Sequence, residues 1–162
     1  MIKLIPVISF LFLILSFTGC GNNRVFEGKK DFEDRYWPKQ EQVHFDFVVS
    51  DKDLEYNLFY TLRYTNTYPY QNIYLQYYLE DSTGRVISKE LNNILLFNAV
   101  TGIPTGDGLG DIITIQKKFL DHYKFPKKGL YNLNIEQFMR LDTLPEILTV
   151  GLQLEKTQDN NE

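Results

Sequence analysis

Apolar and polar residues alternate one by one along most of the chain after position 42, a pattern typical of strands with one buried face. The longest example runs from Leu54 to Tyr64, where every second residue is Leu or Tyr. The same alternation predicts further strands at residues 43–49, 73–79, 85–91, 112–120, 130–138 and 148–154. No stretch after the first 20 residues shows a helical period, so we expect an all-β domain.

Seven or eight short strands separated by turn residues favour an antiparallel two-sheet β-sandwich of the jelly-roll-like kind. Each strand would bury its apolar face against the other sheet. A closed barrel with a ligand in its mouth is the alternative. Residues 92–110 contain several glycines and Pro104, and they are predicted to form a long loop with at most a short strand at 94–97.

The first 20 residues resemble a bacterial lipoprotein signal. Lys3 precedes an apolar run at residues 4–17, which is too short to span a hydrocarbon core of ~30 Å comfortably. Small residues then lead to Cys20, as in a lipobox. The resemblance implies cleavage before Cys20, diacylglycerol on its thiol and acylation of the new N-terminus, which together anchor a protein stably. An uncleaved N-terminal anchor with an incidental cysteine is the alternative.

These patterns divide the chain into four segments. Residues 1–19 are the predicted signal peptide, residues 20–41 a charged tether, residues 42–156 the sandwich domain and residues 157–162 a disordered tail. Trp37 precedes Pro38 near the end of the tether, and we expect its ring to plug the edge of the core.

Net charge narrows the choice of partners. The 162 residues carry a formal charge of −4, with a pI near 5.2, so the chain lacks the basic footprint that nucleic acids require. The same balance argues against a polybasic membrane-binding face. Cys20 is the only cysteine, so no disulfide can form within one chain.

Candidate chemistry is sparse. The glycine-rich stretch 102–110 lacks the Lys and the following helix of a phosphate-binding loop, and also the helix of a dinucleotide fingerprint. Asp107 and Asp111 are not spaced as in an EF-hand, and two histidines, His44 and His122, are too few for a typical zinc site. We therefore expect no catalytic residues, no metal and no cofactor. An envelope hydrolase would need a cluster of His44, Asp46 or other carboxylates in one pocket.

We expect the exposed aromatic residues and the loop residues to bind a partner. Tyr74 and Tyr78 fall on the outward phase of a strand, where they either stack on sugars or a protein or make ordinary cross-strand contacts. The predicted partner-binding residues are Tyr68, Tyr70, Tyr74, Tyr78, Gly106, Asp107 and Gly108.

An ordered series of segments resembles the gliding motility lipoprotein GldH family of Bacteroidota. The segments are 45–47 (FDF), 56–58 (YNL), 62–63 (LR), 68–75 (YPYQNIYL), 106–112 (GDGLGDI), 129–133 (GLYNL), 137–140 (QFMR) and 150–152 (VGL). The similarity spans residues 43–154, and the lipobox agrees with it.

This resemblance implies a non-enzymatic, lipid-anchored envelope protein that supports gliding motility and works beside the type IX secretion machinery. Its expected partners are the membrane, through the lipid on Cys20, and other envelope proteins of that machinery. We expect the domain to face the periplasm. A carbohydrate- or peptidoglycan-binding module is the alternative function, suggested by the outward tyrosines.

Overall fold

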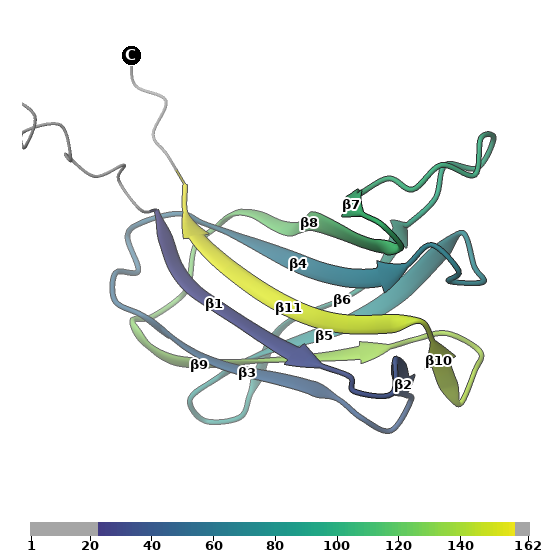
Figure 1. The fold of residues 1–162 in the computed structure, drawn as a ribbon. Coiled ribbons are helices and arrows are strands. Elements are labelled where there is room, and N and C mark those ends of the chain that lie inside the picture. The colour runs from purple at the N-terminus through teal and green to yellow at the C-terminus, as the bar shows by residue number, and fades with distance from the viewer. Residues whose placement is uncertain (1–22, 158–162) are drawn as a thin grey trace, which may run out of the picture.

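The structure, a computed structural model, describes residues 23–157, and these form eleven β-strands (Figure 1). Cys20, the predicted signal peptide and residues 158–162 lie outside the described residues. Within the described range there is no helix, and hence none long and apolar enough to cross a membrane.

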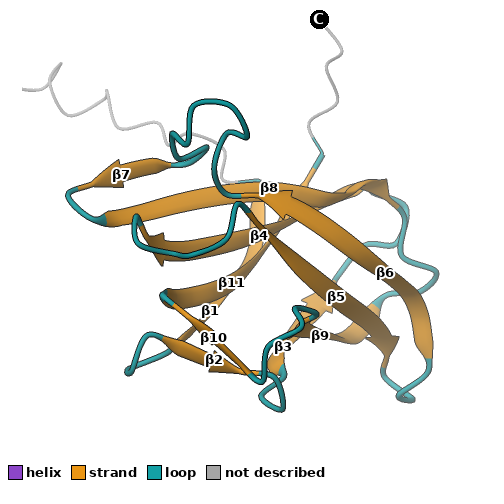
Figure 2. Cartoon of the chain, turned by 90° about the vertical axis from the view of Figure 1, so that its right-hand side faces the viewer, coloured by secondary structure: helices purple, strands orange, loops and turns teal. Residues whose placement is uncertain are grey.

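Two antiparallel sheets form the layers of a sandwich (Figure 2). The five-stranded sheet has the order β1 (Arg24–Asp31), β11 (Ile147–Lys156), β4 (Tyr56–Thr65), β8 (Ile112–Tyr123) and β7 (Asp107–Leu109). The four-stranded sheet has the order β3 (Val43–Val49), β9 (Gly129–Gln137), β5 (Asn72–Asp81) and β6 (Val86–Leu95). A short pair, β2 (Tyr36–Pro38) and β10 (Thr143–Pro145), lies at one end.

The expected all-β class and the antiparallel sandwich are confirmed, but the number of strands was underestimated. Three strands of only three residues each, β2, β7 and β10, are too short to show alternation in the sequence. β6 also continues to Leu95, into the stretch we expected to be loop, and Ile94 and Leu96 are buried. The loop therefore begins later than predicted.

The expected tether is wrong for the described part of residues 20–41, because two strands lie within it. Residues 24–31 form β1, which pairs with β11 from Arg24 opposite Glu155 to Asp31 opposite Thr149. Phe26 packs against Phe45, with ring centroids 6.3 Å apart. Charged residues concealed this strand in the sequence because β1 is the outer strand of its sheet, where lysines and glutamates remain solvated.

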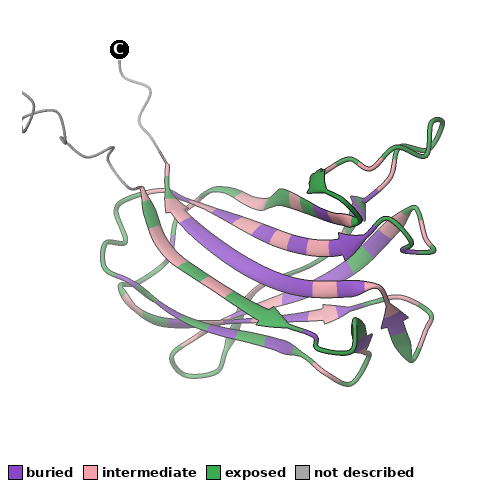
Figure 3. Ribbon diagram, in the orientation of Figure 1, coloured by how far each residue is buried: buried purple, intermediate pink, exposed green. Residues whose placement is uncertain are grey.

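β4 lies in the middle of the five-stranded sheet and alternates between buried and part-exposed residues (Figure 3). Its inward side chains are no more than 1% exposed, and they are Tyr56, Leu58, Tyr60, Leu62 and Tyr64. The tyrosines are long enough to bury their rings while their hydroxyls reach partners at the margin of the core. For example, the Tyr64 hydroxyl donates to the carbonyl oxygen of Leu96 at 2.7 Å.

The two ends of the sandwich differ. At the terminal end, the amide nitrogen of Lys156 donates to the carbonyl oxygen of Asn23, so both ends of the described chain lie together. The turns at 50–55, 82–85 and 124–128 lie at this end. At the opposite end, called the loop end here, lie the connections 66–71 and 96–111 (Figure 1).

Candidate functional site

The connection 96–106 is a structured loop that projects from the loop end. Phe97 and Pro104 form a β-bridge across its base. The Asn98 side-chain oxygen accepts hydrogen bonds from the amide nitrogens of Val100 (2.9 Å) and Thr101 (3.0 Å), which closes a turn. Gly102 completes that turn with a φ of 67°, a conformation that glycine adopts at little cost.

β7 requires glycine for a different reason. A Cβ atom on Gly106 would lie 2.3 Å from the carbonyl oxygen of Thr114, and one on Gly108 would lie 2.6 Å from that of Ile112. Any side chain at these positions would push β7 away from β8. The predicted partner-binding residues Gly106 and Gly108 therefore allow the close approach of two strands, while Asp107 between them is exposed.

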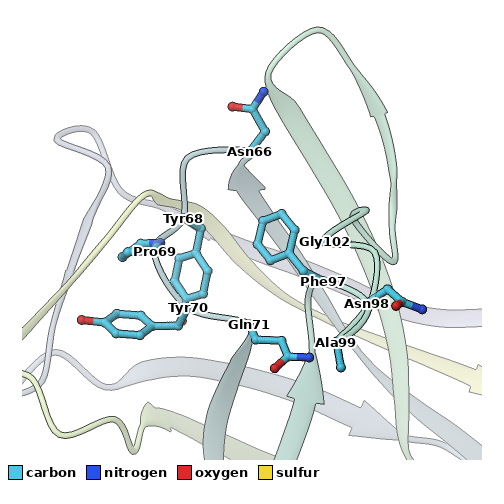
Figure 4. A pocket seen from close by; sticks show the side chains of 9 residues that line it. All are labelled: Asn66, Tyr68, Pro69, Tyr70, Gln71, Phe97, Asn98, Ala99 and Gly102. Carbon is cyan, nitrogen blue, oxygen red and sulfur yellow. The ribbon is translucent and has the colours of Figure 1, made fainter.

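A cavity of about 390 Å³ separates this loop from the connection 66–71 (Figure 4). Tyr68 and Tyr70 form one wall, and Phe97, Asn98 and Gly102 form the other. Tyr68 is only 4% exposed, and its hydroxyl donates to the carbonyl oxygen of Asn72 at 3.1 Å. Burial raises the pKa of Tyr68 well above its usual range, so its hydroxyl stays neutral and acts as a structural donor.

Three large apolar side chains project from this end into solvent. Val100 is 93% exposed, Leu109 is 92% exposed and Ile103 is 62% exposed. Val100 and Ile103 belong to the projecting loop and Leu109 to β7. These three exposed apolar side chains make the loop end a candidate partner-binding cluster.

Tyr74 and Tyr78 do not join this cluster. Both lie on the outer face of β5, where Tyr74 is 38% exposed. The Tyr78 hydroxyl donates to Glu136 at 2.6 Å, and the Lys89 amino group lies 4.6 Å from the centre of its ring. The structure thus places Tyr68 and Tyr70 at one cavity with Gly102, but Gly106, Asp107 and Gly108 do not line that cavity. Tyr74 and Tyr78 lie on a separate surface.

Residues 23–157 provide no group of side chains suited to hold a metal ion, since no three or more His, Asp or Glu residues lie close enough together there. His44 lies 3.7 Å from Asp46 on the open outer face of β3, and both side chains are more than half exposed. His122 hydrogen-bonds Glu55 at 2.7 Å in an equally open position.

The sequence prediction missed the apolar residues of the loop. It singled out the glycines and Asp107, whereas Val100, Ile103 and Leu109 are the side chains that face solvent. Their position in the sequence could have revealed them. They stand among glycines and a proline and outside any alternating run, so no sheet face is available to bury them.

The chain was compared with known proteins. The model of the GldH lipoprotein family matches residues 24–154. A protein named gliding motility lipoprotein GldH, from Flavobacterium johnsoniae, is 31% identical over 92% of this chain and 94% of its own length. A gliding motility lipoprotein GldH homolog from Christiangramia forsetii is 29% identical over 94% of this chain and 96% of its own length.

Proposed function

The chain belongs to the GldH lipoprotein family, and we propose from this that it is a non-enzymatic envelope component of the gliding and type IX secretion machinery. As a member of that family it is a lipid-anchored protein of the cell envelope. We assign lipidation to Cys20 and a periplasm-facing position to the domain. In this proposal the sandwich binds another envelope protein through its loop end.

The single observation that carries the partner site is the exposure of Val100, Ile103 and Leu109. Exposing such side chains to water is unfavourable by roughly 1.5–3 kcal/mol each relative to burying them fully, so covering them with a partner would be favourable. The cavity beside Tyr70 and Phe97 offers an adjoining recess for a side chain of the partner.

The position of the loop end relative to the N-terminus is a second argument for partner binding there. The loop end lies opposite the terminal end, where Asn23 joins the segment that carries Cys20 (Figure 1). An anchored domain therefore holds its apolar loop away from its own anchor, where it meets other envelope proteins. Confinement to one membrane raises the effective concentration of such partners, so a modest apolar surface suffices for binding.

The experiment is in-cell crosslinking in the source organism with mass-spectrometric identification of neighbours. A photoreactive residue at position 100 should capture an envelope protein. The double variant Ile103→Ser, Leu109→Ser keeps the photoreactive residue at position 100 and should lose that capture. The triple variant Val100→Ser, Ile103→Ser, Leu109→Ser, without the photoreactive residue, should impair gliding or type IX secretion. Its thermal unfolding should stay unchanged because these side chains are exposed in the isolated domain.

A matched control removes three other exposed apolar side chains. Val48, Leu91 and Leu130 lie on the four-stranded sheet, away from the loop end, and their replacement by serine should leave capture intact. If the loop variant keeps its crosslinked neighbour, the loop end is not the binding site. If deletion of the whole protein changes neither gliding nor secretion, the proposed role is wrong.

Glycan binding remains a second candidate because of Tyr74. Its ring is part-exposed on a flat sheet face, and Asn93 lies directly opposite it on β6. The Asn72 amide donates to Asn93 at 2.6 Å, so amide groups flank the ring. Sedimentation with purified peptidoglycan sacculi tests this candidate: Tyr74→Ala should abolish any co-sedimentation, and absence of co-sedimentation by the unaltered protein rejects it.

A further inference from the structure

We propose that the terminal end of the sandwich rests on an anionic phospholipid surface and that Lys127 and Lys128 make the contact. The inference rests on the lipid anchor of the proposed function but concerns a different surface from the partner-binding loop. It fixes which way the domain points.

The first argument is the short reach of the anchor. Cys20 is only three residues before Asn23, and a fully extended chain spans at most about 3.6 Å per residue, so about 11 Å separates them at most. Asn23 is hydrogen-bonded to Lys156, and β1 follows at once. Acyl chains on Cys20 therefore hold Asn23, and the terminal end with it, within about 11 Å of the lipidated residue.

The second argument is the pairing of charges at this end. Arg85 pairs with Asp81 at 3.1 Å, and Lys124 pairs with Glu55 at 3.4 Å. Lys52 pairs with its neighbour Asp53. Lys127 and Lys128 are exposed, and neither has an ion-pair partner within 4.0 Å among the described residues. Within residues 23–157, the turns 50–53 and 126–128 thus carry two exposed lysines without an ion-pair partner, against one carboxylate, Asp51, that also has none.

The third argument is a cavity beside these lysines. It measures about 630 Å³ and lies between the turns 50–53 and 126–128. Its lining includes Lys52, Lys127 and Lys128, together with Asp51 and Asp53. Asp51 accepts a hydrogen bond from the Asp53 amide nitrogen at 2.9 Å, and Asp53 pairs with Lys52. Three lysines and two aspartates in this lining leave a net charge of +1, which suits the phosphate of a lipid headgroup.

The turn that carries the lysines is held firmly. Phe125 is buried, and its ring contacts those of Tyr56 and Tyr131. The Tyr131 hydroxyl donates to the Lys127 carbonyl oxygen at 2.6 Å and accepts from the Lys127 amide nitrogen at 3.2 Å. The two amino groups therefore project from a fixed base.

The acyl chains already hold the domain at the membrane, so the two lysines have only to select its orientation there. Each lysine near an anionic surface favours the contact roughly five-fold, which is too little for binding from solution. For a domain whose effective concentration at the membrane is in the millimolar range, the same preference is enough to select one orientation.

The test uses the full lipidated protein in vesicles. Cys20 is the only native cysteine and its thiol is occupied by lipid, so an introduced cysteine is the one free thiol available for a spin label. Ser50→Cys reports on the terminal end and Val100→Cys on the loop end. The vesicles contain phosphatidylcholine alone or an equal mixture with phosphatidylglycerol, each with a headgroup-attached paramagnetic relaxer.

We expect the label at position 50 to relax several-fold faster than that at position 100 in the anionic vesicles. The pair Lys127→Glu, Lys128→Glu should reduce the relaxation at position 50 by at least half. The control pair Lys39→Glu, Lys117→Glu makes the same change in net charge at exposed positions elsewhere and should have no effect. Equal relaxation at both labels, or a label at position 50 that the Lys127 and Lys128 reversal leaves unchanged, overturns the proposal.

A protein that lacks the lipid on Cys20 can be distinguished from a lipidated protein whose terminal end does not contact the membrane. Mass spectrometry of the N-terminal peptide shows whether Cys20 is acylated, and an unacylated protein that does not enter vesicles contradicts the proposed function instead. Loss of the loop-end partner in cells would leave the vesicle result untouched.

Discussion

The amide nitrogen of Lys156 donates a 2.8 Å hydrogen bond to the carbonyl oxygen of Asn23. This bond closes the terminal end, where β1 and β11 begin and end their pairing. Because β11 is also paired with β4, the first described residue is tied directly to the centre of the larger sheet. The described chain thus begins within the larger sheet.

β1 should be a structural strand whose loss destabilises the domain. Phe26 packs between Phe45 and Phe47, with its ring centroid 5.8 Å from that of Phe47. Phe26→Ala should lower the free energy of unfolding by about 2–3 kcal/mol, somewhat below the cost at a fully buried site. Chemical denaturation measures this change. Lys29→Ala on the same strand is the control, and equal effects of the two variants would contradict a packing role for β1.

Trp37 should be among the most costly residues to truncate. It is fully buried, stacks on Phe32 at 5.5 Å and donates from Nε1 to the Glu41 carbonyl oxygen at 2.7 Å. Trp37→Ala should cost about 3–5 kcal/mol, and Trp37→Phe should cost less because the ring remains but the donor is lost. Denaturation followed by circular dichroism checks both. A cost below 1 kcal/mol for the alanine variant would show that this end of the core is not closed by Trp37.

Gly106→Ala should detach the projecting loop and β7 from β8 without unfolding the domain. The new Cβ would meet the backbone oxygen of Thr114, so β7 must detach from β8, while β8 keeps its pairing with β4 on its other side. We expect altered hydrogen exchange confined to residues near 106–114. The partner crosslink at position 100 should weaken. Asp107→Ala, at the exposed neighbouring position that already carries a Cβ, is the control and should leave this hydrogen exchange unchanged.

The turn between β5 and β6 should loosen in acid. Hydrogen bonds from the Thr83 hydroxyl and amide, and then from Arg85, lower the pKa of Asp81 from 3.8 to about 2. A carboxyl group with a depressed folded pKa stabilises the fold above its unfolded pKa and loses that contribution as the pH falls toward 2. Carbon-detected NMR titration of Asp81 checks the direction. In Asp81→Asn the acid-induced change at Thr83 should disappear, and its persistence would assign that change to another group.

High pH should destabilise the core through its tyrosines. Burial raises the pKa of Tyr60 and Tyr68 above the ordinary value of 10.0. A group with a raised folded pKa contributes stability below its unfolded pKa, and that contribution decreases as the pH rises above about 10. Tyrosinate absorbance should therefore increase in two phases, exposed tyrosines first and buried ones together with unfolding. A single phase at the ordinary pKa would contradict the neutral, buried state of these hydroxyls.

Much of the fold was predictable from alternation alone. Residues 56–65 alternate strictly between buried and part-exposed side chains until Tyr64 and Thr65, as the sequence suggested. β1 was not predictable, because Glu27, Lys29 and Lys30 lie on or beside a solvated edge and mask the apolar Phe26. An outer strand needs few apolar residues, since its backbone bonds to only one neighbour.

The candidate site was predicted only in part. The Tyr68–Tyr70 segment and Gly102 line one cavity, whereas the predicted residues Gly106, Asp107 and Gly108 do not. Tyr74 and Tyr78 were grouped with Tyr68 and Tyr70 because they follow closely in sequence. They lie on a different surface because β5 runs away from the loop end and directs its alternate side chains outward.

The sequence by itself determined the all-β class, the inward faces of the long strands and the family, because these depend on residue order and on a two-residue period. Tertiary structure decided that β1 joins the sheet, that Val100, Ile103 and Leu109 are exposed, and that the turn carrying Lys127 and Lys128 lies at the terminal end. Each of these depends on which distant segments meet. A local pattern records how a residue alternates with its neighbours, but not what another part of the chain places against it.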